Sequence, residues 1–191
     1  MKKVILFLVL LSALSVVIGL GGCGGTTPPL TYTIGDTGPA GGLIFYDKGG
    51  FTDGWQYLEA APTDQDYNGD YTVEWGCLET EITGADGTAV DTGEQNTIDI
   101  EAGCTTAGTP ADICANLSIG AFDDWFLPSQ DELNLMYENL KVSGLGGFAD
   151  SGYWSSSEGY AGIAWGQDFY YGFQHYYYKF YTLRVRAVRA F

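Results

Sequence analysis

The sequence predicts an α+β domain with a small, mostly antiparallel sheet, two or three helices and long loops. Three observations support this class. Short aliphatic or alternating segments are separated by Gly- and Asp-containing turns, as in antiparallel strands. A segment after residue 129 has helical periodicity and a complete N-terminal capping signal. Between these elements run long stretches rich in Gly, Asp and Thr that have little periodicity.

The first two strands are predicted early in the domain. Leu43 to Tyr46 is an aliphatic and aromatic run, and Trp55 to Ala60 alternates between apolar and polar residues. The Gly49-Gly50 and Asp53-Gly54 turns between them predict a β-hairpin. The region 62–93 that follows is predicted to be mostly loop.

Two short helices are predicted next, at 94–102 and 110–117. Asn96 or Thr97 could cap the first, because Asn and Thr side chains accept hydrogen bonds from free backbone N–H groups. Pro110 suits the opening turn of the second, where its missing N–H costs nothing.

The strongest helix signal covers 129–141. Ser129 and Glu132 have the spacing of a capping box. Leu133, Met136 and Leu140 recur at helical spacing and form one apolar face. Further along, 183–187 alternates as a strand does.

The segment from 160 to 183 carries the main functional signal. It contains seven tyrosines, and three of them are adjacent at 176–178. Successive side chains of a strand point to opposite faces, so one buried face cannot cover all three. Tyrosine supplies rigid, amphipathic contact area at low entropic cost. We therefore predict an exposed ligand-binding surface.

We expect four large aromatic residues to lie in the core, namely Trp125, Phe126, Trp154 and Trp165. Stacking on a sugar ring is an alternative for Trp165 alone, because it lies inside the aromatic segment.

The N-terminus predicts export. Lys2 and Lys3 precede an apolar stretch that is too short for a membrane span and is typical of a secretory signal. The stretch closes with Leu-Gly-Gly-Cys, which resembles the lipobox of bacterial lipoproteins, in which Cys23 would be lipidated. The alternative is an ordinary signal peptide with a free Cys23. We divide the chain into a signal peptide at 1–22, a lipidated Cys and tether at 23–33, and a domain at 34–191.

Charge restricts the partners. The formal net charge is −16 and becomes −18 once Lys2 and Lys3 leave with the signal. Such a surface repels phosphate backbones and anionic headgroups, so we expect no nucleic-acid partner and membrane contact through the lipid anchor only. The late basic residues could meet an anionic ligand or pair with nearby carboxylates, and the second alternative is favoured: Lys179, Arg184, Arg186 and Arg189.

Three cysteines remain after lipidation, and export predicts one disulfide. Cys104 and Cys114 are closest in sequence and flank a turn, so we expect them to pair and Cys77 to remain free. No zinc site is expected, because the chain has a single histidine, His175.

Asp64, Asp66 and Asn68 have the spacing of the start of a calcium-binding EF-hand loop. The twelfth position, which needs a bidentate carboxylate, is Trp75. A solvated acidic turn explains the segment better, so calcium stays a weak candidate and no other cofactor is expected. The serines at 155–157 lack a nucleophile motif, so we expect no enzyme.

Four separated blocks resemble the lectin-like C-terminal domain of bacterial collagen-like (Lcl-type) adhesins. They are IGDTGPAGGLIFYDKGG with GWQYLEAAP, AFDDWFLPSQDELNLMYENL, YWSSSE and RVRAVRAF. The resemblance implies a C-type-lectin-like fold related to formylglycine-generating enzymes, in which short N- and C-terminal strands pair. The catalytic cysteine pair of those enzymes does not carry over, because Cys104 and Cys114 precede the DDWFLPS block.

The aromatic segment also resembles the variable region of proteins diversified by retroelements, in which Asn codons scatter to codons for Tyr, Phe, His, Asp, Gly, Ile and Leu. This resemblance marks as fixed framework Ala164, Trp165, Gln167, Phe169, Gly172, Gln174, Lys179 and the Arg residues. The ligand-binding positions expected are Tyr160, Ile163, Trp165, Asp168, Tyr170, Tyr171, Phe173, His175, Tyr176, Tyr177, Tyr178, Phe180, Tyr181 and Leu183.

The expected function is ligand binding by a lipoprotein displayed at the bacterial cell envelope, at the outer membrane or cell surface. Its ligand would be a surface protein or a glycan. Two alternatives remain: a glycan-binding adhesin of fixed specificity, and a structural envelope lipoprotein whose tyrosine surface packs on a partner subunit.

Overall fold

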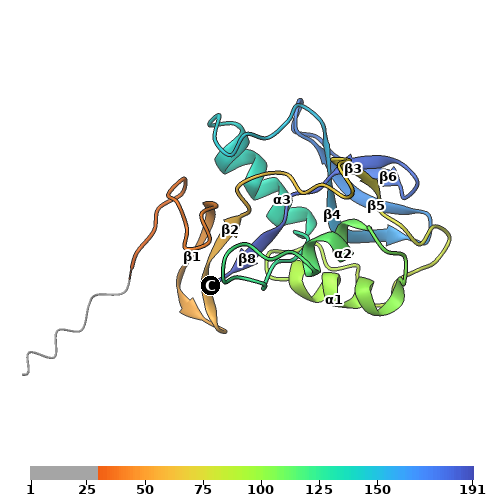
Figure 1. The fold of residues 1–191 in the computed structure, drawn as a ribbon, viewed down its shortest axis with the longest axis horizontal. Helices are drawn as coiled ribbons and strands as arrows, with labels where there is room; N and C mark the ends of the chain where they lie inside the picture. The colour runs from red at the N-terminus through yellow and green to blue at the C-terminus, as the bar shows by residue number, and fades with distance from the viewer. Residues whose placement is uncertain (1–29) are drawn as a thin grey trace, which may run out of the picture. The chain divides into compact units, whose positions relative to one another are not determined.

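A computed structural model describes residues 30–191. The predicted signal peptide, Cys23 and most of the tether lie outside the described residues. The described part is an α+β domain with two sheets and three α-helices (Figure 1). The predicted α+β class is therefore confirmed, but two sheets form where one small sheet was predicted.

The first sheet has three antiparallel strands in the order β1-β2-β8. β1 (Leu43–Thr52) and β2 (Trp55–Ala60) form the predicted hairpin, and β8 (Val188–Ala190) adds to the other side of β2. The hairpin turn contains Asp53 and Gly54, both with positive φ. The N- and C-terminal strands thus share a sheet, but β2 separates β1 from β8.

The second sheet has five strands in the order β3-β7-β4-β5-β6. The bounds are β3 (Thr72–Glu74), β4 (Gly152–Tyr160), β5 (Ile163–Asp168), β6 (Gln174–Tyr178) and β7 (Thr182–Arg184). β3 falls in a region predicted as loop. The strand predicted at 183–187 forms only in part: Leu183 and Arg184 belong to β7, and the chain then leaves this sheet before β8 begins at Val188 in the other.

The two short helices form where predicted. α1 (Gly93–Gly103) begins after Thr92, which makes no side-chain capping bond. Asn96 and Thr97 lie inside the helix, so their predicted capping role is wrong. α2 (Pro110–Ala115) has Pro in its first turn, and the Thr109 side chain accepts the N–H of Asp112.

The third helix carries the predicted capping box. In α3 (Gln130–Met136) the Ser129 side chain accepts the N–H of Glu132, and the Glu132 carboxylate accepts the N–H of Ser129. The helix continues as a π-helical turn, η1 (Tyr137–Lys141). α3 contacts β1 of the first sheet and both β4 and β5 of the second. It therefore links the two sheets.

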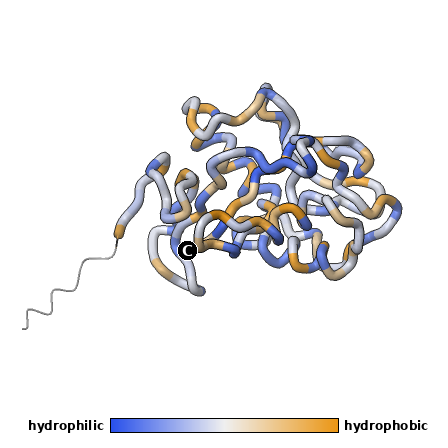
Figure 2. The backbone as a smooth tube through the Cα atoms, in the orientation of Figure 1, coloured by the Kyte–Doolittle hydropathy of each residue, from blue (hydrophilic) through white to orange (hydrophobic). Residues whose placement is uncertain are grey.

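The core has layers on both faces of β4. Tyr153 packs with Phe169, Leu133 and residues of the first sheet. Its neighbour Trp154 points to the opposite face and packs with Trp75 and other residues of the loop and α1. In Figure 2 the hydrophobic residues occur in short stretches separated by hydrophilic ones. None of the helices in the described part has the length and apolar character to span a membrane.

The folded domain begins slightly before its predicted start at residue 34. The Tyr32 N–H donates to the Tyr57 hydroxyl at 3.2 Å. The Tyr32 ring also lies 5.3 Å from that of Tyr57 and 5.5 Å from that of Phe191. The end of the predicted tether is thus packed against the first sheet.

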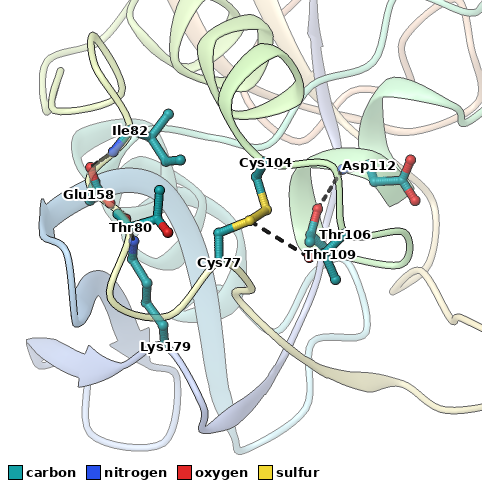
Figure 3. The surroundings of a disulfide bond; sticks show 9 residues. All are labelled: Cys77, Thr80, Ile82, Cys104, Thr106, Thr109, Asp112, Glu158 and Lys179. Atoms are coloured by element: carbon teal, nitrogen blue, oxygen red, sulfur yellow. Dashed lines mark hydrogen bonds and ion pairs between the residues drawn. A yellow bond between two sulfur atoms is a disulfide. The ribbon is translucent and has the colours of Figure 1, made fainter.

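The disulfide differs from the prediction. Cys77 pairs with Cys104, with 5.8 Å between their Cα atoms (Figure 3). Cys114 is buried and has no disulfide partner within residues 30–191. The predicted Cys104–Cys114 bond is wrong, because α2 turns Cys114 into a cluster with Trp125 and Leu127. Burial, with the nearby charge of Glu101, raises the pKa of the Cys114 thiol. Cys77 instead ties the long loop to the end of α1.

Candidate functional site

The aromatic segment forms one end of the five-stranded sheet. β5 and β6 make an antiparallel hairpin, and β6 is the last strand of the sheet (Figure 1). The loop at 169–173 connects the two strands, and a turn at 179–181 leads from β6 to β7. Exposed aromatic residues occur on the strand, the loop and the turn.

We call these exposed residues the aromatic surface. The eight tyrosines and phenylalanines among them are 46–66% exposed, and the histidine is exposed as well. The members are Tyr160, Tyr170, Tyr171, Phe173, His175, Tyr176, Tyr178, Phe180 and Tyr181. All nine belong to the predicted ligand-binding set.

The rings contact one another in two groups. The first runs from Tyr170 through Tyr171 and Phe173 to His175, with neighbouring centroids 4.5–6.3 Å apart. The second contains Tyr178, Phe180 and Tyr181, with centroids 4.9–5.8 Å apart. Such ring contacts limit side-chain freedom before a ligand arrives, which lowers the entropic cost of binding.

Two predicted binding residues are not on the aromatic surface. Ile163 and Leu183 are 6% and 9% exposed and face the core. Ile163 is one of the buried residues of β5, and Leu183 packs in the cluster with Trp75 and Trp154. Their prediction as residues of an exposed binding surface is wrong, because both side chains are buried in the core.

Two further predicted residues are half-buried. Trp165 is neither in the core nor fully exposed, and its ring lies 4.0 Å from that of Tyr176 on the neighbouring strand. Tyr177 packs edge-on against Trp154 at 5.9 Å. Burial, with the nearby charge of Asp168, raises the pKa of Tyr177. The two rings lie on opposite faces of the sheet, Trp165 beside Tyr176 and Tyr177 against the core residue Trp154.

Asp168 shapes the loop. Its carboxylate accepts the backbone N–H groups of Tyr170 and Tyr171 at 2.8 and 3.0 Å. The Asp168 N–H in turn donates to the carbonyl of Phe173 at 2.9 Å. This residue therefore positions the aromatic loop, and its carboxylate is already engaged.

A buried ion pair fixes the turn after β6. The Lys179 ammonium contacts the Glu158 carboxylate and donates to the carbonyl of Thr80 at 2.8 Å (Figure 3). It also lies 4.4 Å from the centre of the Trp75 ring. The Glu158 carboxylate additionally accepts the N–H of Ile82 at 2.7 Å. Lys179 thus holds the turn onto the loop that the disulfide secures.

Side-chain amides hold the hairpin against α3. The Gln174 amide donates to the carbonyl of Gln130 at 2.8 Å. The Gln167 amide donates to Asn134 at 2.8 Å and to the carbonyl of Gly172 at 3.1 Å. The two glutamines therefore act as scaffold residues beneath the aromatic surface.

The late basic residues are paired with carboxylates, as the ion-pair alternative predicts. Arg186 is 2% exposed at its side chain, and Lys179 is fully buried. These cations are not free to form a strip for an anionic ligand. The pairs are Lys179 with Glu158, Arg184 and Arg186 with Asp64, and Arg189 with Asp124 and Glu59.

The three residues of the weak calcium candidate, Asp64, Asp66 and Asn68, have separate structural roles. Asp64 is paired with two arginines and also accepts the hydroxyl of Tyr153 at 2.9 Å. It is therefore not the solvated acid of the predicted turn. Asp66 accepts the N–H of Gly69, and Asn68 has the positive φ of a turn residue. Over residues 30–191 no group of three His, Cys, Asp or Glu side chains is placed to hold a metal ion.

Two of the serines at 155–157 and the single histidine have defined structural contacts. Ser155 and Ser157 are buried, and their hydroxyls donate to the carbonyls of Trp165 and Gly87. His175 has Phe173 and Tyr177 as its ring neighbours. Two pockets, of about 430 and 300 Å³, lie apart from the aromatic surface and are lined in part by acidic residues.

Neither a scan against known protein families nor a search of curated proteins found a match for this chain. The structure adds one feature to the predicted site, which is that β6 is an edge strand. Residue types alone do not reveal strand order. The run QHYYY, which lacks Lys and Pro, was the available signal of an unprotected edge.

Proposed function

We propose that this chain is a lipid-anchored binding protein of the bacterial cell envelope. Its domain has a C-type-lectin-like fold, and the aromatic surface binds a surface protein or a glycan. A retroelement diversifies that surface. The lipid is attached at Cys23, and the protein contacts the membrane through this anchor alone.

The observation that carries the proposal is the division between exposed and buried positions in the segment 160–183. Every member of the aromatic surface is Tyr, Phe or His, which are residue types reached from Asn codons. The residues assigned to fixed framework are buried or hydrogen-bonded, as Lys179, Gln167 and Gln174 illustrate. Diversification needs this arrangement, because exchanges at exposed positions leave the fold intact.

The proposed mechanism is recognition rather than catalysis. Exposed tyrosines offer apolar ring area and a hydroxyl group in the same side chain, so they suit protein and glycan ligands alike. The engaged state of Ser155 and Ser157 also argues against a nucleophile in this region.

The test is to sequence the 3′ end of the gene and some 5 kb beyond it in many isolates. Substitutions confined to the aromatic surface, with a nearby template copy carrying Asn codons, are the expected result. An invariant segment without a template copy would overturn diversification and leave an adhesin of fixed specificity or a structural subunit.

Binding assays separate those two outcomes. A glycan array that retains the purified protein, with retention lost when Tyr171 and Tyr178 are changed to Ala, supports the adhesin. A stable oligomer that buries the aromatic surface supports the structural subunit. Both assays apply when the segment is invariant among isolates, because that result has already excluded a retroelement-diversified receptor.

A further inference from the structure

We propose that the open edge of β6 binds an extended, basic polypeptide segment, which adds to the sheet as a sixth strand. This inference rests on the proposed function, because it names the partner of the aromatic surface. It adds that recognition uses the backbone of β6 as well as its side chains.

The register of the hairpin shows which backbone groups are free. Asp168 N–H donates to the Phe173 carbonyl, and Lys179 N–H donates to the Gly162 carbonyl. Hydrogen-bonded pairs alternate along an antiparallel ladder. His175 and Tyr177 therefore direct their backbone groups toward β5, and those of Tyr176 point away from it.

The outer side of β6 has no strand partner within residues 30–191. Native sheets usually blunt such edges with Lys, Pro or a β-bulge. β6 contains neither residue, and its five consecutive pairs with β5 run without a register shift. The neighbouring β4–β5 pairing has two shifts. A regular, unprotected edge is the structure that accepts an added strand.

The charge of the domain selects a basic partner. Within residues 30–191 all six Lys and Arg side chains form ion pairs with carboxylates. The chain has 24 acidic residues, and six of them take part in these pairs. The net negative charge of the chain attracts a cationic segment, whereas a second copy of this chain would bring the same negative charge.

The aromatic side chains suit the same partner. In an added strand, alternate side chains fall on the two faces of the sheet. One face of β6 presents Tyr176 and Tyr178, and the other presents His175 and Tyr177. Lys and Arg side chains stack favourably on tyrosine rings. Backbone pairing would supply affinity, and the rings would select basic residues.

The experiment starts from the full chain in detergent and a phage-displayed library of random twelve-residue peptides. Each selected peptide is synthesised in two versions, one with N-methyl groups at the odd-numbered residues and one with them at the even-numbered residues. These two versions are the two methylation phases. Methylation removes a backbone donor, so one phase should weaken binding at least tenfold and the other should change it little. The selected sequences should be enriched in Lys and Arg.

A matched pair of variants tests the protein side. Tyr176→Ala removes the ring and keeps the backbone N–H, and Tyr176→Pro removes both. The N–H of Tyr176 is outside the β5 ladder, so proline is tolerated at this edge position. The proline variant should bind selected peptides at least tenfold more weakly than the alanine variant. If Tyr176→Pro fails to fold, the peptide methylation series carries the test.

Each other outcome overturns the inference. These outcomes are no selected peptide, equal loss in both methylation phases, or a concentration-dependent dimer that Tyr176→Pro abolishes. Tyr171→Ala and Tyr178→Ala could weaken peptide binding while the two methylated peptide series bind equally well. In that case the strand-addition inference fails and the proposed function stands. If the ring variants and the methylation series are both without effect, the strand-addition inference fails, and gene sequencing and the glycan array decide the proposed function independently.

Discussion

Lys179 and Glu158 form an ion pair that is closed to solvent, with side chains 0% and 3% exposed. Removing one partner from such a pair leaves a buried charge without compensation. We predict that Lys179→Met lowers the free energy of unfolding by about 3–5 kcal/mol, measured by urea denaturation. The double variant with Glu158→Gln should recover part of the loss.

The matched control is the exposed pair between Lys48 and Asp53, where the aspartate side chain is 83% exposed. Asp53→Asn should change stability by less than about 1 kcal/mol, because exposed pairs contribute little. Asn also tolerates the positive φ at this position. If Lys179→Met lowers the free energy of unfolding as little as Asp53→Asn does, the buried pair is not important for stability.

Neighbouring aromatic residues should respond oppositely to truncation. Phe169 is 1% exposed and packs against Tyr153 at 4.4 Å and Phe148 at 5.3 Å. Phe169→Ala should cost about 3–5 kcal/mol by leaving a cavity. Tyr171→Ala, at a position 66% exposed, should cost about 0.5 kcal/mol or less. Thermal unfolding followed by circular dichroism measures both. A large loss at Tyr171 would contradict its assignment to a tolerant surface.

The disulfide should connect Cys77 and Cys104. Non-reducing peptide mapping by mass spectrometry should find this bond and a free Cys114. Cys77→Ser should lower the free energy of unfolding by about 3–4 kcal/mol, because the bond closes a loop across 27 residues of sequence separation. Cys114→Ser, the control, leaves the bond intact. A Cys104–Cys114 peptide in the map would overturn the assignment.

Stability should fall as the pH rises through the acidic range. Burial raises the pKa of the Glu132 carboxyl from 4.5 to about 7, against the lowering effect of the N–H groups of Ser129 and Asp91. Between these values the folded chain holds a proton that the unfolded chain has lost. The Glu132 contribution therefore decreases across this window, by about 3 kcal/mol in total.

The measurement is the free energy of unfolding from pH 4 to 8 in the native chain and in Glu132→Gln. The variant should lack the downward slope that Glu132 contributes. Asp131→Asn, at the exposed neighbouring position, should keep it. Parallel profiles for the native chain and Glu132→Gln would contradict the assignment.

Elements defined by neighbouring residues could be predicted from the sequence. The capping box of Ser129 and Glu132 and the hairpin ending at Ala60 each depend on residues a few positions apart. Such contacts form through short segments, so local composition determines them. The same reasoning placed most of the aromatic surface, because adjacent tyrosines at 176–178 cannot all be buried.

Features that join distant parts of the chain could not be predicted. Asp64 meets Arg184 and Arg186 more than a hundred residues later, and Cys77 reaches Cys104 rather than leaving it to the nearer Cys114. Strand order and helix packing determine these pairs. The burial of Ile163 and Leu183 depends likewise on which face of a strand meets the core.

The packing of Tyr32 on Tyr57 and Phe191 fixes where the chain enters the domain. It secures the entering chain at the first sheet, whereas β6 lies at the other end of the domain (Figure 1). A partner bound at β6 would therefore lie at the end of the domain away from Tyr32, so binding there and the packing of the entering chain on the first sheet would not compete for the same surface.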